Sequence, residues 1–171
     1  MGARRGTVDV MPSYASAFLI GMVTGLRSMT APAVVTWGIR AGRVQVKNTP
    51  LAFLGHNAAP YISSALAAGE LVVDKLPKTP SRKTPLPFAA RVVIGALCGA
   101  ALSAGNGKLM GGLAAGALGG VAGTLGGYAF RMKSVEATGG GDLPIALLED
   151  AIAISGAVAI VSSCQCPARA E

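Results

Sequence analysis

Acidic residues inside apolar segments are the first feature of this sequence that could do chemistry. Glu70 and Asp74 lie four residues apart in GELVVDKLPKTPSR, and Glu149 and Asp150 are adjacent in LPIALLEDAIAISG. Residues four apart share one face of a helix, so we expect Glu70 and Asp74 to point inward together. Adjacent residues lie about 100° apart around a helix, so we expect only one of Glu149 and Asp150 to face the interior fully. Carboxylates in such positions can bind a cation or a proton.

Arginines occur in the same kind of surroundings. Arg27 lies in the apolar run GLRSMTAPAVVTW, close to several hydroxyl side chains and ahead of Pro32, which we expect to kink the helix. A kinked helix with hydroxyls beside a buried cation is a candidate ligand or anion site. Arg91 and Arg131 are expected near the ends of their helices. A charge inside a span costs about 2.5 to 3.5 kcal/mol, so such residues usually face the bundle interior and pair.

The composition indicates a membrane environment for these residues. Only 13% of the 171 residues are charged, 51% are hydrophobic, and the mean hydropathy is +0.53. Soluble domains contain about 25% charged residues. Aromatic residues make up only 5%, and the abundant small apolar residues suit close helix packing in lipid. We therefore predict an all-α integral membrane helical bundle that contacts the lipid bilayer.

Apolar segments near the ~20 residues needed to cross a bilayer define the predicted helices. We expect a polar N-terminal tail at 1–13, a single transmembrane domain at 14–163 and a polar C-terminal tail at 164–171. The run PLAFLGHNAAP is too short to span and is expected in the interface. The prediction is about five transmembrane helices, with four as the alternative. They cover 14–38, 59–76, 88–104, 108–130 and 143–163.

Glycine forms the strongest internal pattern. Four-residue spacing lets helix backbones approach closely in lipid, where dispersion contacts replace a hydrophobic driving force between helices. The segment 108–130 should therefore lie at the crowded centre of the bundle. The alternative is that a composition rich in Ala and Gly produces this spacing by chance. The glycines form two rows, Gly112, Gly116 and Gly120, and Gly119, Gly123 and Gly127.

Five crossings would place the two ends of the chain on opposite sides of the membrane. The connectors on the side of the N-terminus then carry more cations, which favours a cytoplasmic N-terminus. In this topology Glu70 and Glu149 lie at similar depth, each about 9 Å inside its span. With Arg91 and Arg131 they would form a polar layer on the cytoplasmic half, whereas Arg27 would lie near mid-membrane.

Several kinds of site are excluded by the sequence. The run GNGK at 105–108 lacks the residues of a P-loop and of a dinucleotide fingerprint, so we predict no cofactor. The cations lie in short connectors without an aromatic platform, so nucleic acid is not an expected partner. One histidine, His56, and a Cys164/Cys166 pair without further ligands give neither a metal site nor a catalytic arrangement. We therefore predict that the protein is not an enzyme.

A basic, proline-rich connector follows the second predicted helix. It could contact anionic lipid, because each cation near an anionic surface contributes about 1 kcal/mol. Alternatively, it acts only as a topology determinant. Its candidate lipid-facing residues are Lys78, Arg82 and Lys83.

Four segments together resemble a bacterial membrane family, the domain of unknown function 4126. They are GLRSMTAPAVVTW, GELVVDKLPKTPSRKTPLPFAAR, the glycine-rich segment 108–130 and LPIALLEDAIAISG. The resemblance covers about residues 14–163 and implies a small multi-spanning protein of the bacterial inner membrane. It implies no activity and no site residues.

Two functions of different classes fit these residues. One is permeation, by a channel or secondary transporter for a small ion or polar metabolite. The other is a structural or assembly role, in which the charges fix helix register and the glycine faces mediate oligomerisation. A homo-oligomer is expected, because one small chain would need symmetric copies to enclose a path. The candidate path residues are Glu70, Asp74, Glu149, Asp150, Arg27 and Arg91.

Overall fold

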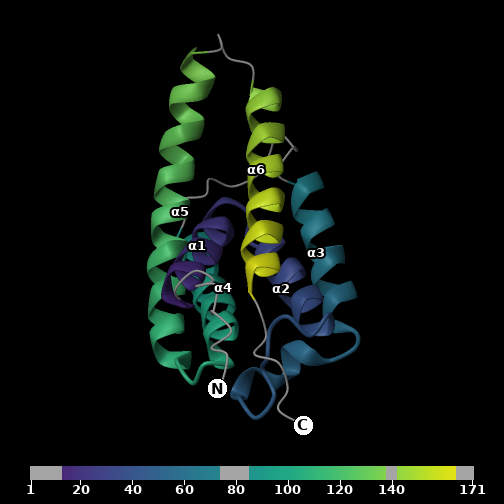
Figure 1. Ribbon diagram of the computed structural model, residues 1–171. Coiled ribbons are helices and arrows are strands. Elements are labelled where there is room, and N and C mark those ends of the chain that lie inside the picture. Colours follow the sequence, from purple (N-terminus) through teal and green to yellow (C-terminus); the bar gives the residue numbers. More distant parts are fainter. Residues whose placement is uncertain (1–12, 74–84, 138–141, 165–171) are drawn as a thin grey trace, which may run out of the picture.

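The protein is a bundle of α-helices in a computed structural model that describes residues 13–73, 85–137 and 142–164 (Figure 1). This part of the chain contains helices and no strand, which confirms the predicted all-α class. The elements are α1 (Ser13–Leu26), α2 (Thr30–Arg40), the 3₁₀ helix η1 (Pro50–Gly55), α3 (Ala59–Val73), α4 (Pro85–Ala104), α5 (Leu109–Ala137) and α6 (Asp142–Ser163).

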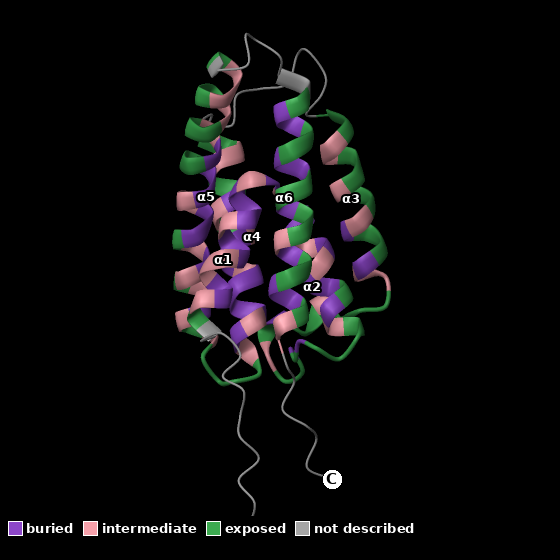
Figure 2. Ribbon diagram, turned by 45° about the horizontal axis from the view of Figure 1, so that its top comes forward, coloured by how far each residue is buried: buried purple, intermediate pink, exposed green. Residues whose placement is uncertain are grey.

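Three of these helices are long and apolar enough to cross a membrane. They are α4 over Pro85–Ala104, α5 over Leu109–Glu136 and α6 over Pro144–Ser163, whereas α1 and α3 are shorter apolar helices. Figure 2 shows exposed residues along the outer faces of the bundle. Many of them are large and apolar, where a soluble protein would carry polar groups. These features indicate membrane association, and the predicted count of five crossings is not confirmed. The exposed side chains include Ile62, Leu66, Val93, Leu118, Leu147 and Val158.

The segment 14–38, predicted as one helix with a kink at Pro32, is two helices. α1 ends at Leu26 and α2 begins at Thr30, so the break lies at residues 27–29. Pro32 falls in the first turn of α2, where a missing backbone N–H costs little because that N–H has no helical acceptor. The proline therefore helps to start a helix, and the predicted kink is wrong.

The chain reverses direction at this break. Val23 of α1 contacts Gly156 of α6, Arg27 at the break contacts Asp150, and Gly38 of α2 contacts Val161. α1 therefore runs antiparallel to α6, and α2 runs parallel to it. Ser13 and Ser163 therefore lie at the same end of the bundle (Figure 1). The prediction that 14–38 crosses the membrane once is wrong. The cation count that favoured a cytoplasmic N-terminus assumed five crossings, so it does not apply to this arrangement.

We call the end that holds residues 41–58 the connector end. The first residues of α1, α3 and α5 and the last residues of α2, α4 and α6 lie there (Figure 1). The break between α1 and α2 lies about 21 Å above this end, since α1 has 14 residues and a helix rises about 1.5 Å per residue. The break is thus inside the bundle, because α5 and α6 are about 43 Å and 33 Å long.

α5 packs between α1 and α4 through its glycines. A methyl group at Gly116 would overlap the carbonyl oxygen of Gly95 on α4, and one at Gly123 would overlap the backbone of Met22 on α1. Backbones this close leave no room for side chains. α5 nevertheless lies at one side of the bundle (Figure 1), and its residues Met110, Leu118 and Leu125 are exposed. The prediction that 108–130 lies at the crowded centre is therefore wrong, because the glycines bring α5 close to α1 and α4 only. Both rows are occupied by contacts within the chain: Gly112, Gly116 and Gly120 face α4, and Gly119, Gly123 and Gly127 face α1.

Candidate functional site

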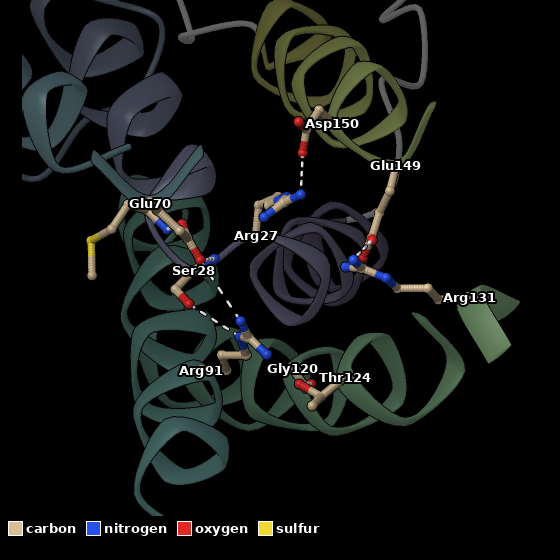
Figure 3. Close-up of polar contacts among 10 residues, drawn as sticks. Arg27, Ser28, Glu70, Arg91, Gly120, Thr124, Arg131, Glu149 and Asp150 are labelled. Atoms are coloured by element: carbon tan, nitrogen blue, oxygen red, sulfur yellow. Dashed lines mark hydrogen bonds and ion pairs between the residues drawn. The ribbon is translucent and has the colours of Figure 1, made fainter. Parts of the chain in front are cut away.

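Glu70 of α3 binds the backbone at the break between α1 and α2 (Figure 3). Its Oε1 accepts a hydrogen bond from the N–H of Ser28 and its Oε2 accepts one from the N–H of Met29, both at 2.8 Å. The last helical bond of α1 runs from the N–H of Arg27 to the oxygen of Val23, at 2.8 Å. Buried N–H groups that lose a helical acceptor need another partner. The carboxylate of Glu70 supplies it, and so stabilises the break.

Arg91 of α4 holds the same carboxylate from the other side. Its Nε donates to the Oγ of Ser28 at 3.1 Å, and its Nη2 lies 3.8 Å from Oε1 of Glu70. Arg91 is only 5% exposed, and the Glu70 side chain is 13% exposed. Two backbone N–H groups ahead of α2 and one guanidinium therefore surround one carboxylate. Helix N-termini bind anions through groups of this kind.

Arg27 pairs with Asp150 and so connects the break to α6. Its Nη2 lies 2.5 Å from Oδ1 of Asp150, and the two side chains are 1% and 10% exposed. Charges buried to this degree are costly unless they are paired, so this contact fixes α6 against the break. The prediction that Arg27 lies apart from the acidic residues is wrong, because α1 ends at the level of Asp150 and does not continue past it.

Glu149 pairs with Arg131 of α5, whose Nη1 lies 3.7 Å from Oε2 of Glu149. Glu149 is 2% exposed and Asp150 is 7% exposed, so both are buried. The prediction that only one of them faces the interior fully is wrong. The reason is that α6 is covered on two sides here, by the break on one and by α5 on the other.

These residues form three ion pairs around the end of α1 (Figure 3), and we call them together the polar cluster: Arg27, Ser28, Glu70, Arg91, Arg131, Glu149 and Asp150. Its three guanidiniums and three carboxylates balance in charge, and they come from five helices or their ends. Asp150 is eight residues into α6, about 12 Å from the start of that helix. Within the polar layer predicted for these residues, Arg91 pairs with Glu70 and Arg131 pairs with Glu149. Chemically, the cluster can hold an anion in place of a carboxylate or fix five helices together.

Several predicted residues lie outside the described part of the chain. They are Asp74, the basic connector residues Lys78, Arg82 and Lys83, and Cys166. Cys164 is half-buried after the end of α6, where its Sγ donates to the oxygen of Ile160 at 3.4 Å and burial raises the pKa of its thiol. Within residues 13–73, 85–137 and 142–164, no three His, Cys, Asp or Glu side chains lie together as a metal site.

Three contacts at the break could not be predicted from the sequence: the hydrogen bonds from Ser28 and Met29 to Glu70, and the pair of Arg27 with Asp150. The sequence does carry a start signal for α2, because Thr30 and Pro32 are residue types favoured at a helix N-terminus. The continuous apolar character of 14–38 hides this signal. The partner of Arg27 depends on the break, so it cannot be identified without it.

No protein-family model, no curated protein and no solved structure matches this chain. The resemblance to the domain of unknown function 4126 therefore stays a prediction, and the functional conclusion depends on the geometry of the cluster.

Proposed function

We propose that this chain is a permeation protein of the bacterial inner membrane, a channel or secondary transporter whose path passes the polar cluster. The observation that carries the proposal is the chain reversal at residues 27–29, which brings backbone N–H groups and six charged side chains together inside the bundle. Non-helical backbone at membrane depth is tolerated where it is buried in protein or lines a cavity. Broken helices of this kind form the substrate sites of many transporters.

A small anion is the substrate class that fits the cluster best. The carboxylate of Glu70 is itself an anion, held by two N–H groups and by Arg91. A substrate anion that displaced it would meet the same donors. Arg91 also donates its Nε to the Oγ of Ser28, so this guanidinium would remain in place when Glu70 was displaced. The pair of Arg27 with Asp150 would meanwhile keep the break in place.

Transport by the purified full-length chain in liposomes tests this proposal. Chloride, nitrate and acetate serve as anion probes, and Na⁺ and K⁺ as cation probes. Arg91→Gln removes the guanidinium beside Glu70 and should lower anion transport about tenfold or more, since a hydrogen bond to a charged group contributes about 1.5–3 kcal/mol. Glu136→Gln neutralises an exposed acid of α5 outside the cluster and should leave transport unchanged.

The carboxylates are tested in the same liposomes. Glu70→Gln keeps the shape of the side chain but removes the internal anion, so anion transport should change in rate or selectivity. If Glu70→Gln, Glu149→Gln and Arg91→Gln all move every probe as the parent chain does, the proposed path is abandoned.

A structural role is the second candidate, because each ion pair of the cluster closes between different helices. The pairs join α1 to α6, α3 to α4, and α5 to α6. If the role is structural, none of these substitutions affects transport, and each one that breaks an ion pair lowers the stability of the fold. Assembly through glycine would need a face other than the two rows on α5, since both rows contact helices of the same chain. A homo-oligomer is part of the permeation proposal, and crosslinking of the purified chain in liposomes tests it.

A further inference from the structure

The acids whose side chains the structure describes are confined to one half of the bundle, where arginines pair with three of them. They are Glu70, Glu136, Glu149 and Asp150, and all four lie in the half away from the connector end. Four cations, Arg40, Arg43, Lys47 and Lys108, lie at the connector end together with His56. Within the described part of the chain, the connector end therefore has a net positive charge that no carboxylate balances.

A pocket of about 500 Å³ opens at this end, between the end of α2, the connector and the start of α3. Its lining combines cations with apolar side chains and includes no acid. Val44, Val46 and Pro60 are buried and form its firm inner wall. The pocket is also lined by Arg40, Lys47, His56, Ile39, Ala52 and Leu54.

Arg40 is held at the pocket by aromatic rings. Its guanidinium carbon lies 5.8 Å from the ring centroid of Trp37 and 5.6 Å from that of Tyr61, and its Nη1 donates to the oxygen of Asn57 at 3.4 Å. The two rings pack edge to face, with centroids 5.5 Å apart. The indole Nε1 of Trp37 in turn donates to the Oγ of Ser64 at 3.1 Å. Within the described part of the chain no carboxylate pairs with Arg40, and a cation held in this way is suited to an anionic ligand.

The surroundings of the pocket are those of a membrane interface. Trp37 and Tyr61 are exposed, as such rings are at the level of lipid headgroups. Phe53 of η1 is also exposed and lies between the lining residues Ala52 and Leu54, and Ile62 of α3 is exposed two residues after the lining residue Pro60. An occupant could thus place a negative group among the cations and an apolar tail against α3.

We propose that this pocket binds the phosphate headgroup of an anionic lipid, with Arg40 and Lys47 contacting the phosphate and the acyl chains lying along the exposed apolar face of α3. Cations at the edge of a bundle bind lipid phosphates in this way, and each contributes about fivefold to affinity. A soluble phosphate compound has the same anionic group without acyl chains. The acid-free lining fits both sources, and the exposed Phe53 and Ile62 favour the lipid. The site is separate from the polar cluster, so it does not depend on the permeation proposal.

The single tryptophan of the chain reports on this site directly, because Trp37 contacts Arg40. The full-length chain is reconstituted in phosphatidylcholine vesicles that contain brominated phosphatidylglycerol or brominated phosphatidylcholine. The ratio of the two quenching efficiencies measures the preference for the anionic lipid. Lys47→Gln should reduce this preference about fivefold. Lys47 is exposed, and the polar and ring contacts of Trp37 are with Arg40, Tyr61 and Ser64, so this change should disturb neither the fold nor the emission.

The matched control is Lys108→Gln. Lys108 is also a cation of the connector end, but it lies over the ring of Tyr14 at 5.3 Å and does not line the pocket. Its replacement should leave the preference unchanged. Arg40→Gln serves as a second test variant and should reduce the preference as Lys47→Gln does.

Three results would overturn the proposal. One is equal quenching by the two brominated lipids in the parent chain. Another is an equal loss in Lys47→Gln and Lys108→Gln, which would indicate general surface charge rather than a site. The third concerns the source of the phosphate: if millimolar glycerol 3-phosphate relieves quenching by brominated phosphatidylglycerol, the pocket takes a soluble phosphate and the lipid assignment is wrong. No relief by glycerol 3-phosphate, together with the selective loss in Lys47→Gln, supports it.

Discussion

Replacing Gly116 with alanine should destabilise the bundle, whereas the same change at Gly126 should not. Both residues are in α5. A Cβ at Gly116 would overlap the carbonyl oxygen of Gly95, which is backbone and cannot rotate away, whereas a Cβ at Gly126 would meet no atom within 4 Å. Alanine is favoured over glycine in a helix by about 0.5–1 kcal/mol at both positions, so this contribution cancels between the two variants. Overpacking remains, so Gly116→Ala should be less stable than Gly126→Ala by about 1–3 kcal/mol.

Unfolding in mixed micelles of mild detergent and dodecyl sulfate, followed by circular dichroism, measures this difference. The parent chain should lie between the two variants or close to Gly126→Ala. Equal stability of Gly116→Ala and Gly126→Ala would refute the close packing of α4 on α5. A large loss of stability in both variants would show that α5 tolerates no added methyl group at either position. The contact of Gly116 with Gly95 would then not explain the effect of Gly116→Ala.

Three further outcomes follow from the break and from the end of α6. Arg27→Gln leaves the buried carboxylate of Asp150 without this guanidinium and should cost about 3–5 kcal/mol in the same unfolding assay. Asp150→Asn in that background should restore part of the loss, and no restoration would contradict the pairing. Reporter domains fused to the two ends of the chain should lie on the same side of the membrane, and reporters on opposite sides would contradict the chain reversal. Burial raises the pKa of the Cys164 thiol, so less reactive thiolate is present at a given pH. In a Cys166→Ser variant, maleimide labelling of Cys164 should therefore rise at higher pH than labelling of glutathione does, and identical pH profiles would contradict this.

Helices α3 to α6 could be predicted from the sequence because each is an apolar run with polar or glycine- and proline-containing connectors beside it. The predicted segments 59–76, 88–104, 108–130 and 143–163 coincide with these helices apart from their ends. α4 starts earlier, at Pro85, since proline is tolerated in a first helical turn. α5 continues to Ala137 even though its last residues are polar. End positions depend on local capping and solvation, which hydropathy does not record.

The break between α1 and α2 could not be predicted, because its causes lie elsewhere in the chain. Hydropathy is high throughout 14–38, and the group that satisfies Ser28 and Met29 is Glu70, more than forty residues away. Pairing of Arg91 with Glu70 could be expected from charge and depth alone. The pair of Arg27 with Asp150 could not, since it exists only because α1 stops where it does.

The position of the break follows from what each half of 14–38 must contact. α1 lies parallel to α5, because its residues 14 to 26 contact α5 in ascending order from Gly111 to Gly127. α2 instead packs on α3 and α6, where Thr36 shares a hydrogen bond with Ser63 at 2.9 Å. One straight helix cannot make both sets of contacts, so the chain must turn and free two buried N–H groups. A neutral acceptor would satisfy them equally well, but the acceptor present is the charged Glu70, and its charge in turn requires Arg91. Packing alone therefore explains the turn but not the carboxylate. This is the physical reason to look for exchangeable anions at Glu70.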